Sequence, residues 1–201
     1  MIAIIDYDAG NTHSVKNALT YLGADVCLTS SPEEIYRADK VILPGVGHFG
    51  AAMEKLETRR LMPVIRTLVK EETPLLGICL GLQMLFSGSE EAPDTTGLCL
   101  LPGFVKRFTQ KDGFKIPQIG WNTLSVRKGS RLLAGIESGS AVYFVHSYYA
   151  KADDPSVVAA TTEYTDIADV AVEKGNLFAT QFHPEKSGQT GLAILRNFLS
   201  V

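Results

Sequence analysis

Short apolar runs alternate with helical patterns over the first half of the chain. Runs at residues 2–6, 25–29, 40–43 and 75–78 are rich in aliphatic residues and are typical of strands buried on both faces of a parallel sheet. Helices are predicted at 14–22, from Ser31-Pro32 onward, at about 51–56 and at 63–71, where apolar residues recur with helical spacing. This alternation predicts a doubly wound parallel sheet with right-handed crossovers.

The pattern changes after residue 86. A polar stretch at 87–97 is expected to form a loop, and strand-like segments follow one another with short turns between them. These segments are 98–108, 142–151, 157–163, 168–173 and 177–182, before a final helix near 191–199. The predicted fold class is therefore α/β, with an open, mostly parallel doubly wound sheet, helices on both faces and added antiparallel strands.

One cysteine lies where the fourth strand is expected to turn into a helix. The stretch Gly77-Ile78-Cys79-Leu80-Gly81 has the form of a nucleophile elbow, a sharp strand-to-helix turn that projects a reactive side chain. The two glycines are expected where strand and helix approach too closely for side chains. The positive end of the helix dipole would favour a thiolate. The alternative is a buried structural cysteine in a glycine-flanked turn.

A cysteine nucleophile needs a base, and the base needs an orienting group. Among four histidines, His183 alone is followed by a glutamate two residues on, with a proline between them that limits the backbone. Glu185 would then fix the tautomer of the imidazole ring. His13 is expected at the surface of an early helix, and His48 is left unassigned beside a glycine-rich loop. His146, within a strand, is compatible with a hydrogen-bonded core histidine.

Composition and charge restrict the classes of protein considered. The 201 residues are enough for one domain with a real core, and 45% hydrophobic and 20% charged residues are ordinary for a globular protein. A net charge of −3 gives no reason to expect a nucleic-acid surface, and no run approaches the ~20 apolar residues of a membrane helix. Three cysteines without a C-x-x-C pair favour a reducing, cytoplasmic setting. No ligand spacing suggests a metal, and no cofactor is expected.

Two motifs together resemble a known family. Gly77–Gln83 and His183-Pro184-Glu185 are similar to the triad (class I) glutamine amidotransferases, which use a cysteine to release ammonia from glutamine. Further stretches, covering nearly the whole chain, resemble the family of glutaminase subunits of imidazole glycerol phosphate synthase, an enzyme of histidine biosynthesis. These stretches are 6–11, 44–53, 118–122, 143–148 and 183–188. The resemblance implies a single glutamine amidotransferase domain over 1–201.

The resemblance implies a role for each matching residue. Cys79, His183 and Glu185 would form the catalytic triad. The backbone N–H of Leu80 and the loop Gly45-Val46-Gly47 would stabilise the oxyanion, because glycines let backbone amides turn toward a ligand. Substrate glutamine would be held by Gln83, one helical turn beyond the nucleophile, and by the segment His146-Ser147-Tyr148. A tight turn without further function is the alternative for the glycine loop.

A glutaminase of this length leaves no room for a synthase domain, so a second chain must receive the ammonia. The resemblance implies the cyclase subunit, a (β/α)8 barrel, as partner in a heterodimer. The interface residues expected are Gln118, Trp121 and Lys186. Trp121 is expected in a loop bounded by proline and glycine, with a core position as the alternative. Low glutaminase activity is expected until the partner and its ribonucleotide substrate are bound.

Two departures from the family pattern stand outside the triad. Asp8 occupies a position where the family usually has glycine, and Gln118 replaces its usual histidine. Three other functions compete with the main hypothesis. They are a glutaminase serving anthranilate or pyridoxal phosphate synthesis, a non-catalytic module that retains the fold, and a thioesterase or other cysteine hydrolase.

Overall fold

Five parallel strands form the part of the sheet that positions the site. The computed structural model describes residues 1–201, and the strands run in the order β2-β1-β3-β4-β14. Their bounds are β1 Ile2–Ile5, β2 Val26–Thr29, β3 Lys40–Gly45, β4 Leu75–Cys79 and β14 Leu177–Thr180. The predicted parallel core is therefore confirmed. Because β3 and β4 are adjacent, Gly45 pairs in register with Cys79, and both lie at the carboxyl edge of the sheet.

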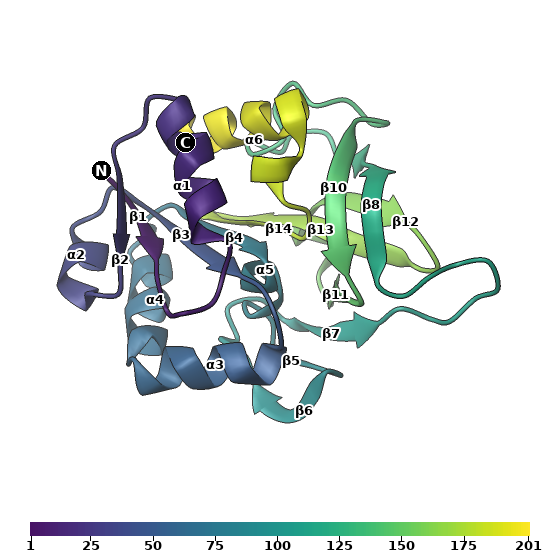
Figure 1. Cartoon of the computed structure of the whole chain (residues 1–201), viewed down its shortest axis with the longest axis horizontal. Coiled ribbons are helices and arrows are strands. Elements are labelled where there is room, and N and C mark those ends of the chain that lie inside the picture. Colours follow the sequence, from purple (N-terminus) through teal and green to yellow (C-terminus); the bar gives the residue numbers. More distant parts are fainter.

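Helices cover both faces of this sheet, as the alternation of patterns predicts. Figure 1 shows α1 (Thr12–Tyr21) and α6 (Gly188–Ser200) above it and α3 (Phe49–Thr58) and α4 (Leu61–Lys70) below it. The short α2 (Pro32–Tyr36) begins as predicted, because the Ser31 hydroxyl accepts a hydrogen bond from the Glu34 N–H and proline occupies the first turn.

The two helical layers correspond to two buried clusters. Along β1, Ala3 and Ile5 pack with α3 and α4, whereas Ile2 and Ile4 pack with α1 and α6. Successive strand side chains point to opposite faces, so a strand covered on both sides must be apolar throughout. This requirement explains the short continuous apolar runs of the sequence.

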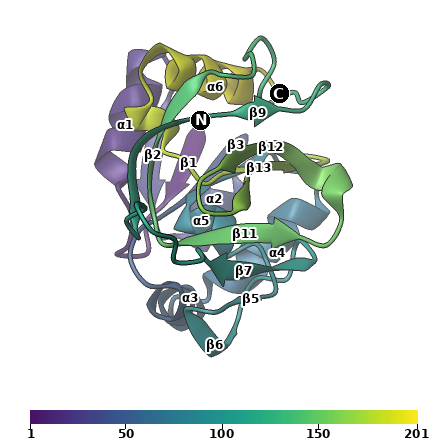
Figure 2. The ribbon, with the colours of Figure 1, turned by 90° about the vertical axis from the view of Figure 1, so that its right-hand side faces the viewer.

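Mostly antiparallel strands extend the sheet beyond β14. The order continues β13-β11-β7-β5-β6, and β12 and β9 lie off this path. Figure 2 shows this part curving away from α6 toward β6. Its strands are β5 Gly88–Ser89, β6 Ala92–Thr96, β7 Gly103–Arg107, β9 Ser125–Val126, β11 Tyr148–Ala152, β12 Val158–Glu163 and β13 Ile167–Lys174. A 3-10 turn, η1 (Pro155–Val157), precedes β12.

A second, two-stranded sheet stands beside the first. It pairs β8 (Gln118–Thr123) antiparallel to β10 (Ala141–His146). The expected single strand at 142–151 is wrong: β10 and β11 belong to different sheets and meet at Ser147. The strand-like residues continue through both strands without a turn signal such as glycine or proline, so the change of sheet is hidden in the sequence.

Three further expectations are corrected. The stretch 87–97 is not a loop, because it contains the β5–β6 hairpin, and only 103–107 of the segment 98–108 is strand. The helix after Cys79, α5, covers only Leu80–Gln83, so its dipole is that of a single turn and supports the thiolate far less than a long helix would. The other predicted helices and strands agree within a few residues.

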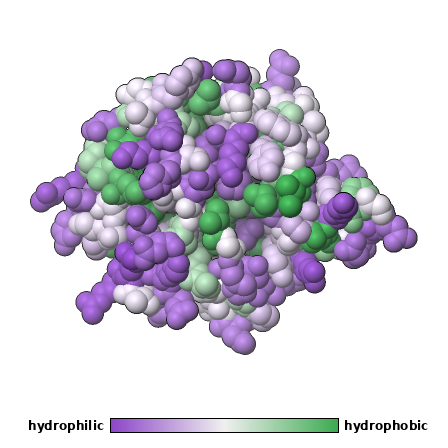
Figure 3. All heavy atoms as spheres, in the orientation of Figure 1, coloured by the Kyte–Doolittle hydropathy of each residue, from purple (hydrophilic) through white to green (hydrophobic).

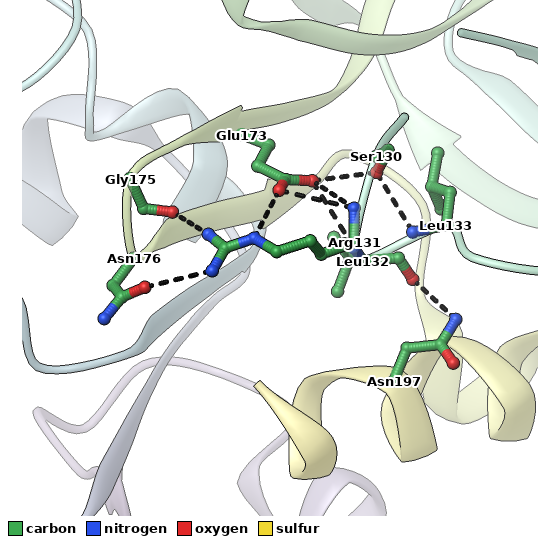
Figure 4. Close-up of polar contacts among 8 residues, drawn as sticks. All are labelled: Ser130, Arg131, Leu132, Leu133, Glu173, Gly175, Asn176 and Asn197. Atoms are coloured by element: carbon green, nitrogen blue, oxygen red, sulfur yellow. Dashed lines mark hydrogen bonds and ion pairs between the residues drawn. The ribbon is translucent and has the colours of Figure 1, made fainter. Parts of the chain in front are cut away.

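A polar network anchors the segment before β10 to the end of β13. Figure 4 shows Arg131 directed at Glu173, Gly175 and Asn176, with 2.9 Å between Arg131 Nε and Glu173 Oε1. The Ser130 hydroxyl also donates to Glu173, at 2.8 Å. The network ties this segment to the β13–β14 turn, and β14 leads directly to the site.

Candidate active site

The turn from β4 into α5 forces Cys79 into an unusual backbone conformation. Its φ is 57° and ψ is −110°, a region that only glycine adopts without strain. A Cβ on Gly81 would lie 1.9 Å from the Leu43 carbonyl oxygen, and one on Gly77 would lie 2.9 Å from Gly81 backbone atoms. The close approach predicted for the two glycines is confirmed. The turn holds the cysteine at the edge of the sheet.

Cys79 opens onto a cavity of about 260 Å³ at the carboxyl edge of the sheet. Nine residues singled out in the sequence line it: Val46, Gly47, Cys79, Leu80, Gln83, His146, Ser147, Tyr148 and His183. Glu91, Pro117 and Val145 complete the lining. Residues from four distant parts of the chain therefore converge on one space.

His183 and Glu185 form a buried pair behind the cysteine. His183 directly precedes the 3-10 turn η2 (Pro184–Lys186), which contains Glu185, and His183 Nδ1 lies 2.8 Å from Glu185 Oε1. The backbone of His183 is held by Tyr143, through an N–H bond of 3.0 Å to its carbonyl, and by the Ser187 hydroxyl, which donates to the His183 carbonyl at 2.7 Å. His183 Nε2 has no hydrogen-bond partner and is on the cavity side.

The electrostatic environment of His183 favours its protonated form. Burial is the largest influence on its pKa and acts to lower it. The Cys79 sulfur and the Glu185 carboxylate together outweigh burial and raise the pKa of His183 from 6.5 to about 10. A protonated imidazole beside a sulfur is the arrangement that stabilises a thiolate.

The loop Gly45-Val46-Gly47 is also anchored, at the end of β3. Gly45 has no room for a side chain, because a Cβ would lie 2.8 Å from the Tyr7 hydroxyl. That hydroxyl is buried and donates to the Pro44 carbonyl at 2.8 Å, and burial together with the nearby Cys79 raises the pKa of Tyr7. Gly47 adopts a φ of 95°, which glycine permits, and lines the cavity with Val46. The loop Val46-Gly47 thus begins at an immobilised strand end.

Gln83 and His146 converge on the carbonyl oxygen of Tyr148. The Gln83 amide nitrogen donates to it at 3.0 Å, and His146 Nδ1 lies 2.8 Å from it. A carbonyl can only accept, so His146 carries its hydrogen on Nδ1. Burial lowers the pKa of His146 to about 4 and keeps the ring neutral. His146 is thus a buried, neutral histidine of the cavity wall.

Three polar residues of the site carry no motif in the sequence. The Glu91 carboxylate reaches the cavity from the β5–β6 turn and accepts from the Phe49 N–H at 2.7 Å. The Asn11 amide donates to Glu185 Oε1 at 3.3 Å. The Gln181 amide donates to the Cys79 sulfur at 3.6 Å. Of the three, only Asn11 lies in a stretch that resembles the family, residues 6–11, and none was singled out by itself.

The three expected interface residues differ in their exposure. Gln118 is 4% exposed and contacts His146 Nε2 at 3.1 Å, so a partner contact by its side chain does not fit the structure. Trp121 is 59% exposed, which excludes the core alternative, and it lies on β8 rather than in a loop. Lys186 is exposed beside the triad.

Trp121 belongs to an apolar outer face of the small sheet. Alternate residues of the two strands share this face, and four of them are Ile119, Trp121, Tyr143 and Val145. The rings of Trp121 and Tyr143 contact edge to face, and Val145 also lines the cavity. Figure 3 shows hydrophobic surface over β8 and β10, where Ile119 is 64% exposed.

His13, His48 and Asp8 do not line the cavity. His13 is exposed on α1, as expected. His48 caps α3, because its Nδ1 accepts from the Gly50 N–H at 3.1 Å. Asp8 adopts the left-handed conformation, with a φ of 60°, and its carboxylate pairs with Arg59.

No three His, Cys, Asp or Glu side chains are grouped to hold a metal ion, and none of the helices has the length and apolarity needed to span a membrane.

Comparisons with known proteins identify the family to which the chain is similar. A family model described as glutamine amidotransferase class-I matches residues 3–201. The imidazole glycerol phosphate synthase subunit HisH of Thermosynechococcus vestitus is 50% identical over 202 residues, which cover 100% of this chain and 96% of the relative. The subunit of the same name from Bacillus thuringiensis is also 50% identical, with 100% and 95% covered.

Solved structures share the fold at low sequence identity. One described as a crystal structure of glutamine amidotransferase has a TM-score of 0.78 at 22% identity, covering 100% of this chain and 98% of that chain. The structure of PurLQS from Thermotoga maritima has a TM-score of 0.75 at 19% identity, covering 99% and 97%. At these identities the likeness concerns the fold alone.

Proposed function

We propose a mechanism from the premise that this chain belongs to the class-I glutamine amidotransferase family and, within it, to the HisH subunits of imidazole glycerol phosphate synthase. The chain hydrolyses glutamine within that synthase, in histidine biosynthesis. The whole of residues 1–201 acts as one glutaminase domain, in the cytoplasm, where its three free cysteines fit a reducing setting.

The nucleophile is the Cys79 thiolate, paired with protonated His183. Its sulfur attacks the side-chain carbonyl carbon of glutamine and forms a tetrahedral intermediate. Backbone N–H groups of Leu80 and of the Gly45-Val46-Gly47 loop stabilise the negative oxygen. Support comes from the pairing of Gly45 with Cys79, which sets the loop beside the elbow.

His183 transfers the protons of both half-reactions. Its Nδ1–H is bonded to the Glu185 carboxylate, so Nε2 faces the cavity and gives a proton to the departing ammonia. The neutral ring then takes a proton from water, which hydrolyses the thioester and releases glutamate. Glu185 fixes the ring and stabilises its charged form.

Glutamine is oriented by polar groups at the far end of the cavity. Both hydrogens of the Gln83 amide are donated to protein acceptors, so its oxygen is left to accept from the substrate α-ammonium group. The Glu91 carboxylate, which also lines the cavity, supplies a negative charge for this ammonium group. The segment His146-Ser147-Tyr148 binds the α-carboxylate end.

The partner of this chain is the cyclase subunit of the synthase, in a heterodimer, and we propose that it is a (β/α)8 barrel. The apolar face of the small sheet, with Trp121, forms part of the contact, because it is continuous with the cavity mouth through Val145. Exposed Lys186 pairs with an acidic residue of the partner. Docking over the cavity lets ammonia pass without protonation in water.

The proposal rests above all on one observation: a strained Cys79 shares a cavity with His183, whose Nδ1 is held by a buried glutamate. The test is a glutaminase assay with the cyclase subunit, following glutamate with and without the phosphoribulosyl substrate. Activity is expected to be low for the isolated chain and to rise in the complex with that substrate.

An electrophilic glutamine analogue tests the residue assignment in the same complex. It is expected to label Cys79 in the wild-type chain and to give no label in Cys79→Ser. Cys99→Ser is the matched control, because Cys99 is exposed and outside the cavity. Absence of labelling at Cys79 with the partner bound would contradict the enzymatic mechanism. High turnover by the isolated chain would contradict the need for a partner.

A further inference from the structure

A chain of side-chain amides links the Tyr148 carbonyl to the nucleophile. The Gln83 amide nitrogen donates to the Tyr148 carbonyl at 3.0 Å and to Gln181 Oε1 at 2.9 Å. The Gln181 amide nitrogen then lies 3.6 Å from Cys79 Sγ. The Gln181 side chain is completely buried and is not part of the cavity wall.

The direction of this chain is determined by its first member. A backbone carbonyl cannot donate, so Gln83 must present its NH2 group to Tyr148. The second hydrogen of that NH2 group is directed at Gln181, which must therefore present its oxygen. The Gln181 NH2 group is left facing the sulfur, because the reverse orientation would place two donors against each other and an oxygen against the sulfur.

The backbone of Gln181 is fixed as well. Its N–H donates to the Val170 carbonyl of β13 at 2.8 Å, and His183, two residues on, is bound to Tyr143 of β10. The backbone from which the Gln181 side chain reaches the sulfur is therefore anchored to strands on both sides.

We propose that Gln181 is a hydrogen-bond donor to the Cys79 sulfur, held in its donating orientation by the Tyr148 carbonyl through Gln83, and that it favours the thiolate over the thiol. A donor stabilises a charged acceptor more than a neutral one, so the contact acts on the nucleophile before attack and on the sulfur as leaving group in thioester hydrolysis. The inference rests on the proposed role of Cys79 as nucleophile.

The test measures the thiolate without using glutamine. The full-length chain is alkylated with iodoacetamide over a range of pH, and mass spectrometry follows the peptide that contains Cys79. In Gln181→Met, which keeps the length but removes the donor, the pH of half-maximal alkylation rate is expected to rise by about one to two units. At neutral pH the rate would fall about tenfold or more.

A second variant covers the case in which Gln181→Met does not fold. Gln181→Asn keeps the amide but is one methylene shorter, so it cannot contact Gln83 and the sulfur together, and the same direction of shift is expected. Thr180→Val is the matched control, because Thr180 is an equally buried neighbour whose hydroxyl donates to the Phe182 carbonyl instead. Its alkylation midpoint is expected to equal that of the wild type.

Exposed Cys99 provides an internal standard, since its alkylation profile should be the same in every variant. An unchanged midpoint for Cys79 in a folded Gln181 variant would overturn the proposal, even if glutaminase activity fell. Failure of Cys79 to react with the glutamine analogue would instead contradict the proposed function, so the two failures are distinguishable.

Discussion

Replacing Gly81 by alanine tests the close approach on which the elbow depends. The added Cβ would lie 1.9 Å from the Leu43 carbonyl oxygen, whereas ordinary contact begins at 3.4 Å, so β3 and α5 must separate by about 1.5 Å. The obstacle is backbone of a central strand, which cannot rotate away as a side chain can. Overpacking of this kind costs about 1–3 kcal/mol and more where backbone must move.

Helix propensity acts in the opposite direction but is smaller. Gly81 lies within α5, and alanine at a helical position is favoured over glycine by at most about 1 kcal/mol. Taking the upper end of the overpacking cost, because backbone must move, we expect Gly81→Ala to lower the free energy of unfolding by about 2 kcal/mol or more. With a urea m-value of about 3 kcal/mol/M for a chain of this size, the midpoint falls by about 0.7 M or more.

Gly50→Ala is the matched control for this measurement. Gly50 lies in the first turn of α3, and its added Cβ would meet only side-chain atoms, at 3.2–3.4 Å. The change in the free energy of unfolding is therefore expected to stay within about 1 kcal/mol. Glutaminase activity in the complex should fall with Gly81→Ala and persist with Gly50→Ala. Equal urea midpoints for Gly81→Ala and the wild type would refute the reasoning, because the elbow would then have room for a side chain.

Three other perturbations address separate parts of the molecule. Glu185→Gln removes a carboxylate that raises the pKa of His183, so this pKa should fall. The alkaline limb of the glutaminase pH profile should then move to lower pH, and kcat should drop about 10²-fold or more. An alkaline limb at the wild-type pH would argue against the ion pair. Burial lowers the pKa of His146 to about 4 in the folded chain, against 6.5 in the unfolded chain. Between these pH values the unfolded chain binds the extra proton, so the free energy of unfolding should decrease by at most about 3 kcal/mol as pH falls from 6.5 to 4. A wild-type slope, by urea titration, no steeper than that of His146→Asn would contradict this burial effect. Trp121→Ala should leave the unfolding free energy within about 0.5 kcal/mol of wild type but weaken binding of the cyclase subunit about 30-fold, by titration calorimetry, whereas the equally exposed control Ile167→Ala should not.

The positions of the central residues of the candidate site could be predicted from the sequence, because the features that restrict them are local. The glycines around Cys79 and the proline between His183 and Glu185 restrict the backbone, and such restrictions are visible in the residues themselves. The parallel strands are equally visible, because burial on both faces requires continuous apolar runs.

Strand β8 of the small sheet is missed for a physical reason. Strand β8 buries Gln118 and exposes Ile119 and Trp121, so its pattern is the reverse of an ordinary half-buried strand. Periodicity rules assume that apolar side chains point inward. Where a surface is apolar, the pattern no longer indicates which side is the core.

The supporting polar residues could not be predicted because their roles depend on contacts distant in sequence. Gln181 is 102 positions from Cys79, and Asn11 is 174 positions from Glu185. The local sequence does not distinguish a glutamine whose amide contacts a buried sulfur from a glutamine whose side chain faces water.

Ser147 is the only residue between the last strand of the small sheet and β11 of the large one. Its neighbours His146 and Tyr148 line the cavity from either side of that junction. A substitution that tilts the small sheet is therefore expected to displace this wall of the cavity as well. If the small sheet contacts the partner as proposed, we expect changes in partner choice and changes in the shape of the cavity to be coupled in this chain.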